Sequence, residues 1–173
     1  MNLEEHIRSI PDFPKKGILF RDITTLIKDK DAFACAIEML TEKYKSEKID
    51  KIIAVESRGF ILGAALAYTL HAGFVPVRKK GKLPAATISV SYSLEYGIDH
   101  LEIHKDALSK GEKVLIVDDL LATGGTVAAT IDLVEQFGAK IIGIAFLIEL
   151  VDLHGRDKLK NYPICSLIQF HGE

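Results

Sequence analysis

The chain has 173 residues, of which 48% are hydrophobic and 27% are charged. This length and balance are typical of one globular domain with a sizeable core, and they exclude a disordered chain. A formal net charge of -2 gives no overall attraction to nucleic acid or anionic membranes, and Cys35 and Cys165 lie too far apart in sequence for a metal motif. We therefore expect a single domain over residues 1–173 in the cytoplasm, with no nucleic acid or membrane as a partner.

The first 30 residues contain PDFPKKGILFRDITTLI, in which two prolines and a glycine interrupt an apolar pattern. Prolines and glycines favour turns over regular elements. We expect an irregular, lid-like segment here, followed by a helix over residues 31–45.

Short apolar runs rich in β-branched residues alternate with helical patterns along the rest of the chain. The expected strands cover residues 51–55, 74–77, 114–117 and 141–150, and the expected helices cover residues 60–73 and 126–138. The last strand is apolar on both faces, which is typical of a parallel sheet covered on both sides. The sequence predicts an α/β fold with a central, mainly parallel sheet flanked by helices.

A different pattern lies between these runs, where ATISVSY and DHLEIHK each alternate between apolar and polar residues. This predicts two half-exposed strands joined by a turn around Gly97, which together form a projecting hairpin over residues 85–106. His100, Glu102 and His104 share one face of the second strand, but their spacing is not that of HExxH. We expect a solvated polar face there and not a zinc site.

Three polar loops follow the predicted strands, and in a parallel sheet such loops meet at one edge. The third, DDLLATGGT (118–126), has small residues whose backbone N–H groups can surround an oxyanion at the start of a helix. It is neither a Walker A motif nor GxGxxG. Asp118 and Asp119 would repel a bare phosphate, but they can accept hydrogen bonds from a ribose diol or lie near a magnesium-bound water. The loop therefore predicts a sugar phosphate as the ligand.

The other two loops, ESRGF (56–60) and RKKGK (78–82), supply cations in a chain that is acidic overall. A guanidinium or ammonium group beside a sugar-phosphate site favours a second, larger phosphate group. We interpret the two loops as a site for pyrophosphate.

Taken together, these blocks resemble the type I phosphoribosyltransferases, in which a strand ends in two acids before a Thr-Gly-rich loop. FRDIT (20–24) and SYSLEYG (91–97) are similar to the members that use adenine, and the likeness extends from Ile7 to Phe170. The resemblance implies the type I phosphoribosyltransferase fold, with a flexible catalytic hairpin over residues 85–106 and a hood over the base pocket at residues 1–30. It also implies purine salvage, in which the 5-phosphoribosyl group moves from phosphoribosyl pyrophosphate to adenine, giving AMP and pyrophosphate. A homodimer and Mg²⁺, held mainly by the substrate and not directly by the protein, are further implications.

The resemblance also implies roles for individual residues. The 5-phosphate would lie on Ala122, Thr123, Gly124, Gly125 and Thr126, and the ribose hydroxyls on Asp118 and Asp119. Pyrophosphate would lie near Ser57, Arg58, Arg78, Lys79 and Lys82, and adenine near Leu19, Phe20 and Arg21. The catalytic residues would be Glu95, Tyr96 and Arg58, and we hypothesise that Glu95 handles a proton of the purine ring.

Two alternatives stay open from the sequence. The same scaffold can serve hypoxanthine, guanine, xanthine or orotate, because a few pocket groups decide which base is accepted. A regulator that senses the sugar phosphate and binds nucleic acid or protein is a second alternative, although the chain lacks spare length or a basic face for a DNA-binding domain.

Overall fold

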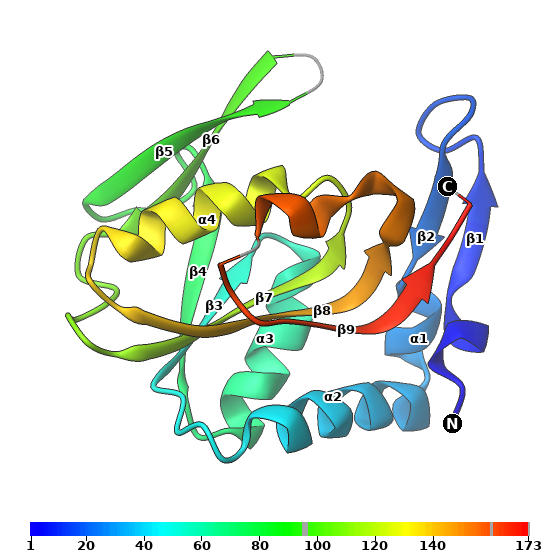
Figure 1. The fold of residues 1–173 in the computed structure, drawn as a ribbon, viewed down its shortest axis with the longest axis horizontal. Coiled ribbons are helices and arrows are strands. Elements are labelled where there is room, and N and C mark those ends of the chain that lie inside the picture. Colours follow the sequence, from blue (N-terminus) through cyan, green and yellow to red (C-terminus); the bar gives the residue numbers. More distant parts are fainter. Residues whose placement is uncertain (95–96, 160, 173) are drawn as a thin grey trace.

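The computed structural model describes residues 1–94, 97–159 and 161–172 of the chain. Its centre is a seven-stranded sheet (Figure 1). The strands are β3 (Lys51–Val55), β4 (Gly73–Lys79), β5 (Thr87–Leu94), β6 (Gly97–His104), β7 (Lys113–Leu121), β8 (Lys140–Leu150) and β9 (Ile164–Phe170). They lie in the order β5-β6-β4-β3-β7-β8-β9, in which β4, β3, β7, β8 and β9 are parallel neighbours. The expected α/β fold with a mainly parallel sheet is confirmed.

Helices cover both faces of this sheet. Helices α2 (Lys30–Tyr44) and α3 (Arg58–Thr69) pack on one face, and α4 (Gly125–Glu135) packs on the other (Figure 1). The Asp29 side chain begins α2, because its Oδ1 accepts hydrogen bonds from the N–H groups of Asp31 and Ala32 at 3.0 Å each. In the described part of the chain, no helix combines the length and apolar character needed to cross a membrane.

The end of β7 lies four residues beyond the position expected from its apolar run. The strand continues through Leu121, because Asp118 and Leu120 remain paired with Phe146 and Ile148 of β8. The two aspartates therefore belong to the strand itself and do not follow it. This pairing holds both aspartates in a buried strand of the sheet.

The middle of the chain forms the expected antiparallel hairpin, with Thr87 opposite His104 and Leu94 opposite Gly97. The expectation of a solvated polar face on its second strand was wrong for Glu102. This residue is only 7% exposed, and its Oε2 accepts a hydrogen bond from Gly81 N at 3.0 Å. The cause is that the base of β6 also pairs with β4, which places Glu102 beneath the turn that follows β4.

The N-terminal segment is more regular than expected. It contains a short 3-10 helix η1 (Leu3–His6), a two-stranded sheet of β1 (Arg8–Pro11) and β2 (Leu19–Asp22), and helix α1 (Thr24–Lys28). The prolines lie at the end of β1 and in the turn, so they leave the strand pairing intact. This segment, which we call the hood, and the β5–β6 hairpin rise from opposite ends of the main sheet toward the same side (Figure 1).

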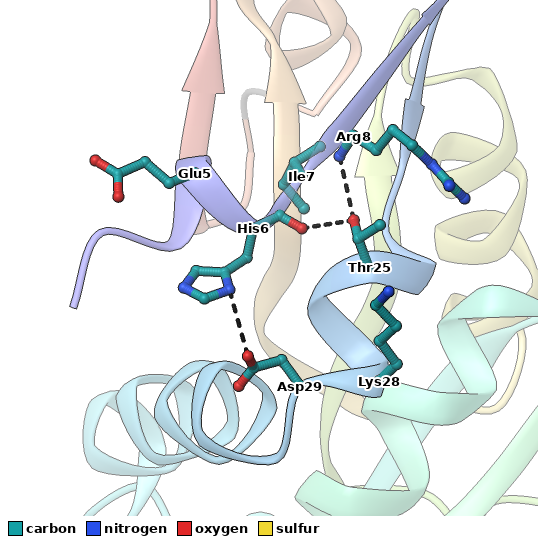
Figure 2. A pocket seen from close by; sticks show the side chains of 7 residues that line it. All are labelled: Glu5, His6, Ile7, Arg8, Thr25, Lys28 and Asp29. Carbon is teal, nitrogen blue, oxygen red and sulfur yellow. Dashed lines mark hydrogen bonds and ion pairs between the residues drawn. The ribbon is translucent and has the colours of Figure 1, made fainter.

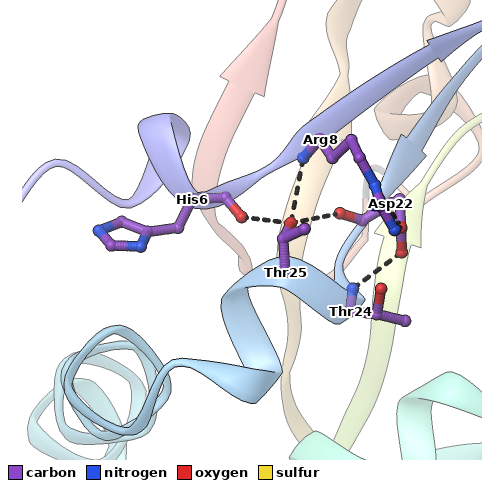
Figure 3. Close-up of polar contacts among 5 residues, drawn as sticks. All are labelled: His6, Arg8, Asp22, Thr24 and Thr25. Atoms are coloured by element: carbon purple, nitrogen blue, oxygen red, sulfur yellow. Dashed lines mark hydrogen bonds and ion pairs between the residues drawn. The ribbon is translucent and has the colours of Figure 1, made fainter.

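An ion pair between the exposed Arg8 and the buried Asp22 joins the two hood strands (Figure 3). Arg8 donates from Nε and Nη2 to Asp22 Oδ2 at 3.0 and 2.5 Å, and Thr24 N donates to Asp22 Oδ1 at 2.9 Å. Thr25 Oγ1 donates to the His6 carbonyl at 2.6 Å and accepts from Arg8 N at 3.2 Å. These bonds tie the start of β1 to the first turn of α1.

Asp22→Asn is expected to lower the free energy of unfolding at pH 7 by about 1.5 kcal/mol, because the hydrogen bonds from Arg8 lose their charged acceptor. The hydrogen bonds from Arg8 lower the pKa of Asp22 to about 2. A lowered pKa gives stability that is present above pH 4 and is lost as the pH falls toward 2. Urea unfolding at pH 7, 4 and 2 should therefore show a difference from the wild type that shrinks with acid. A constant difference would contradict this account.

Candidate active site

A cavity of about 440 Å³ opens where β3, β4 and β7 end. Its walls come from the loop after β3, the end of β4, the hairpin and the end of β7. The lining residues are Val55, Glu56, Ser57, Arg58, Lys79, Tyr92, Leu101, Asp118, Asp119, Leu120 and Thr126. The parallel sheet thus brings together residues from all three predicted loops, at the edge where open α/β sheets bind ligands.

Residues 122–126, which we call the phosphate loop, connect β7 to α4 and line a small adjoining hollow of about 80 Å³. Gly124 precedes α4 with a left-handed backbone (φ 78°). The first N–H groups of a helix have no partner within the helix, so they are available to an anion at this position. The arrangement suits a phosphate group bound by backbone amides.

Gly124→Ala is expected to destabilise the fold by about 2 kcal/mol, because the new side chain would combine backbone strain with a steric clash. A Cβ at this position would lie 2.5 Å from the carbonyl oxygen of Gly155. The matched control is Gly125→Ala in the same loop, where the nearest atom to a new Cβ is Ser93 O at 3.9 Å. Thermal unfolding should show a loss for the first variant only; equal losses would contradict the proposed clash.

The two aspartates form a buried acidic pair on β7. Asp118 is 9% exposed and Asp119 is 5% exposed, and Asp119 N donates to Asp118 Oδ1 at 2.8 Å. Burial, together with the neighbouring Asp119 carboxylate, raises the pKa of Asp118 well above its usual value. The start of α3 packs closely against this pair, because a Cβ added at Gly59 would lie only 2.8 Å from Asp118 Oδ1. The carboxyl oxygens of this pair can accept hydrogen bonds from a diol.

Arg58 provides the positive charge next to this pair. Its Nε lies 2.6 Å from Asp119 Oδ2, although the N–H group is not aimed along that line. Asp119 Oδ2 is therefore buried and in an ion pair, without an aligned hydrogen bond from the described part of the chain. Carboxylate oxygens of this kind are ligands that Mg²⁺ prefers, and they accept hydrogen bonds from Mg²⁺-bound waters. Among residues 1–94, 97–159 and 161–172 there is no group of three or more His, Cys, Asp or Glu placed to hold a metal ion.

The other predicted cations are at different distances from the cavity. Lys79 lines it and forms an ion pair with Asp99 of β6 at 3.0 Å, which raises the pKa of Lys79. Arg78 is directed to Glu56, with Nε 2.7 Å from Oε2. Lys82 is exposed in the turn after β4 and does not line the cavity. The structure thus gathers Ser57, Arg58 and Lys79 but leaves Lys82 outside.

Tyr92, in the SYSLEYG motif, lines the cavity, whereas the sequence left open whether it would pack in the hairpin or contact a ligand. It lies on β5, and its hydroxyl donates to Asp99 Oδ2 at 3.5 Å, close to the Lys79–Asp99 pair. Burial raises the pKa of Tyr92. The alternation of β5 predicted a half-exposed strand but could not tell which of its side chains would face the cavity.

The hood approaches this site from the side opposite the β5–β6 hairpin (Figure 1). The ring of Phe20 lies 5.3 Å from the Arg58 guanidinium carbon and packs edge-on against Phe13. Arg21 is directed elsewhere, since its Nη1 donates to Ser9 Oγ at 2.6 Å and its guanidinium lies 3.8 Å from the Phe170 ring. Leu19 is partly exposed, at 36%. Phe20 therefore joins the hood to Arg58, a residue of the cavity.

Two expected catalytic residues, Glu95 and Tyr96, lie outside the described residues. The strands on either side of them, β5 and β6, are described and form the sides of the projecting hairpin.

A second cavity of about 410 Å³ lies at the foot of the hood (Figure 2). Its charges are mixed and mostly paired, because Arg8 contacts Asp22 and His6 lies 3.8 Å from Asp29. It shares no lining residue with the cavity at the strand ends. Its chemistry does not match the predicted sugar-phosphate site.

The family model described as phosphoribosyl transferase domain matches residues 24–170, which include the cavity loops, the phosphate loop and most of the sheet. The fold, the acidic pair on β7 and the loop that follows it agree with that match. The chain belongs to the phosphoribosyltransferase family.

Relatives and solved structures show which members of the phosphoribosyltransferase family the chain is similar to. The chain is 58% identical over 170 residues to the adenine phosphoribosyltransferase of Brachyspira hyodysenteriae, covering 98% of this chain and 100% of that protein. It is similar to the crystal structure of adenine phosphoribosyltransferase from Thermoanaerobacter pseudethanolicus, with a TM-score of 0.94, 59% identity and coverage of 98% and 100%. The Saccharomyces cerevisiae enzyme, complexed with adenine and an imino-altritol bisphosphate, gives a TM-score of 0.90 at 44% identity, covering 95% and 96%. These likenesses place the chain among the adenine phosphoribosyltransferases.

Proposed function

We propose that this protein transfers the 5-phosphoribosyl group from phosphoribosyl pyrophosphate to adenine, giving AMP and pyrophosphate in purine salvage. The observation that carries the proposal is that the buried Asp118–Asp119 pair lies in the cavity next to the hollow lined by the phosphate loop. A sugar phosphate is the ligand that needs both. The high identity to adenine phosphoribosyltransferases over nearly the whole chain supports adenine as the base.

The reaction breaks the bond between ribose C1 and a pyrophosphate oxygen and forms a bond from C1 to a purine nitrogen, which loses its proton. Asp118 and Asp119 would hold the ribose hydroxyls and so position the sugar carbon that becomes cationic. Arg58 and Lys79 would stabilise the charge on the departing pyrophosphate, with Ser57 beside them. Arg78, near the end of β4, and Lys82, in the turn that follows, would add positive charge at a greater distance. Amides of residues 122–126 would hold the 5-phosphate throughout.

The base would lie under the hood, next to Leu19, Phe20 and Arg21. The hood and the β5–β6 hairpin flank the open side of the site (Figure 1), which suits exclusion of water from the reacting carbon. Glu95 and Tyr96 remain the predicted catalytic residues of the hairpin, and Glu95 the predicted group that handles the purine proton.

Mg²⁺ would enter with phosphoribosyl pyrophosphate and be held mainly by that substrate, with Asp118 and Asp119 close enough to contact its waters. When bound, it would neutralise charge on the pyrophosphate leaving group. The buried Asp119 Oδ2, which has no aligned hydrogen bond from the described residues, suits this arrangement.

A homodimer and a cytoplasmic location complete the proposal. The apolar surface of α3 and the start of β4 suits an interface, because Tyr68 is 85% exposed, Ile61 41% and Phe74 38%. Sedimentation velocity would measure the oligomeric state. A dimer that dissociates on Tyr68→Asp is expected, and a monomeric wild type would contradict the dimer.

The test of the function is turnover of phosphoribosyl pyrophosphate and Mg²⁺ with adenine, hypoxanthine, guanine, xanthine and orotate in turn. Adenine should give AMP and pyrophosphate in equal amounts, with a kcat/KM roughly a thousandfold or more above the other bases. Nucleotide formed from another base would overturn the specificity. Saturable binding of phosphoribosyl pyrophosphate without product from any base would overturn the proposed enzymatic activity. It would instead indicate a regulator that senses the sugar phosphate.

A further inference from the structure

Glu149 is a buried carboxylate near the end of β8, with 3% exposure. Arg156 donates from Nε to its Oε1 at 2.5 Å and from Nη2 to its Oε2 at 2.6 Å. Ser166 Oγ and Gln169 Nε2, both from β9, donate to the same Oε2 at 2.5 and 3.1 Å. Mainly because of the hydrogen bonds from Arg156, the pKa of Glu149 is lowered to about 2. The pair is therefore fully charged at neutral pH and held from both strands.

Arg156 belongs to the segment that connects β8 to β9. The segment contains two short 3-10 helices, η2 (Val151–Leu153) and η3 (Gly155–Lys158), joined at His154, whose backbone is left-handed (φ 53°). In Figure 1 it is the orange-red coil beside the start of α4. The side chain of Arg156 reaches back from this coil to Glu149 and also donates to Ser166 Oγ at 3.0 Å. It ties the connecting segment to the sheet.

The residue next to Arg156 is in direct contact with the phosphate loop. A Cβ on Gly155 would lie 2.2 Å from the carbonyl oxygen of Ala122, and a Cβ on Gly124 would lie 2.5 Å from the carbonyl oxygen of Gly155. The two backbones therefore touch without room for even a methyl group. A shift of the Gly155 backbone would therefore change the packing that positions Ala122 and Gly124 of the phosphate loop.

We propose that Glu149 and Arg156 are positioning residues for the phosphate loop, acting through Gly155. The inference rests on the proposed function, in which residues 122–126 bind the 5-phosphate. Neither side chain lines the cavity, so neither touches the substrate. Their task is to fix the loop amides before the phosphate arrives, because a group that must first be ordered binds more weakly than one already in place.

A buried ion pair does not by itself indicate a gain in stability, since apolar residues can often replace it without loss. Here the pair anchors, through Arg156, a segment whose backbone contacts the anion-binding turn at Gly155. A positioning role makes a prediction that a purely structural role does not make. Disturbing the pair should weaken binding of the 5-phosphate and leave the pyrophosphate subsite, on the loops after β3 and β4, as it was.

The test is isothermal titration of ribose 5-phosphate and, separately, of pyrophosphate with Mg²⁺ into the full chain. Glu149→Gln keeps the shape of the side chain but removes its charge, and Ser166→Ala is a milder variant in case the first folds poorly. Both should weaken ribose 5-phosphate binding, the first by about tenfold, with pyrophosphate affinity unchanged. The matched control is Val114→Ala, a core truncation at the opposite end of β7, where the side chain is fully buried. It should lower thermal stability and leave both affinities unchanged.

Equal losses for the two ligands in Glu149→Gln, or unchanged ribose 5-phosphate binding in both variants, would overturn the inference while leaving the proposed function in place. Wild-type protein that binds pyrophosphate but not ribose 5-phosphate would instead overturn the assignment of the phosphate loop, and the inference with it.

Discussion

Asp119→Asn is expected to lower kcat/KM for phosphoribosyl pyrophosphate by about a hundredfold, because the ribose hydroxyls that we propose to bind here would lose a carboxylate acceptor. Asp119 is buried, and its Oδ2 lies 2.6 Å from Arg58 Nε. The amide would also leave the Arg58 charge without its partner beside the pyrophosphate. Steady-state kinetics at saturating adenine would measure the loss.

The control for this variant is Asp50→Asn at the opposite end of the sheet. Asp50 Oδ2 accepts a hydrogen bond from Lys113 N at 2.7 Å, so the same chemical change is made to an aspartate that touches the same strand far from the cavity. Its kcat/KM should stay within about twofold of the wild type, because the site is not touched. Comparable losses in the two variants would show that Asp119 acts through the fold and not on the ribose.

Asp118→Asn is expected to act on activity and stability in opposite directions. Turnover should fall by about a hundredfold, because the carboxyl next to the ribose is replaced. The melting temperature at pH 7 should rise by about 3 °C. Burial and the Asp119 charge raise the pKa of Asp118, so the folded state resists an ionisation that the unfolded chain undergoes freely. The amide removes this cost and can still accept the hydrogen bond that Asp119 N donates to Asp118 Oδ1.

The sign of the pH dependence follows from the direction of this shift. A raised pKa costs the folded state nothing below pH 4, where the carboxyl is protonated in both states, and the cost grows as the pH rises toward the folded pKa. The stability gain of Asp118→Asn should therefore be absent near pH 3.5 and increase toward pH 7. Differential scanning calorimetry across this pH range would measure the stability difference between the variant and the wild type. A variant less stable than the wild type at pH 7 would contradict the conclusion that burial disfavours ionisation of Asp118.

The elements that the sequence predicted best are those whose pattern is decided locally. KIIAV is apolar and β-branched between polar neighbours, and β3 has the expected bounds. The strand around VLIV was predicted too short, because Asp118 and Asp119 are polar and the pairing with β8 that extends β7 is a contact distant in sequence. Strand β9 was not predicted, since ICSLIQF mixes polar and apolar residues and is held by its parallel pairing with β8.

The residues of the site divide in the same way, into those marked by local sequence and those that depend on contacts distant in sequence. The residues of the phosphate loop and the acidic pair were identifiable because their chemistry lies in one continuous stretch. The Glu149–Arg156 pair was not identifiable, and the role of Tyr92 could not be decided, since these positions depend on which strands become neighbours in space. No local pattern marks a glutamate in an otherwise apolar strand as the partner of an arginine seven residues later.

The most direct test of the account is a crystal structure of the protein with AMP. We expect the 5-phosphate within about 3 Å of the backbone N–H groups of residues 122–126, which is hydrogen-bonding distance. The ribose hydroxyls should contact Asp118 and Asp119, and the adenine ring should lie under the hood beside Phe20. AMP bound in the cavity at the foot of the hood, or with its phosphate on Arg58 and Lys79 and the phosphate loop empty, would contradict the assignment of this site.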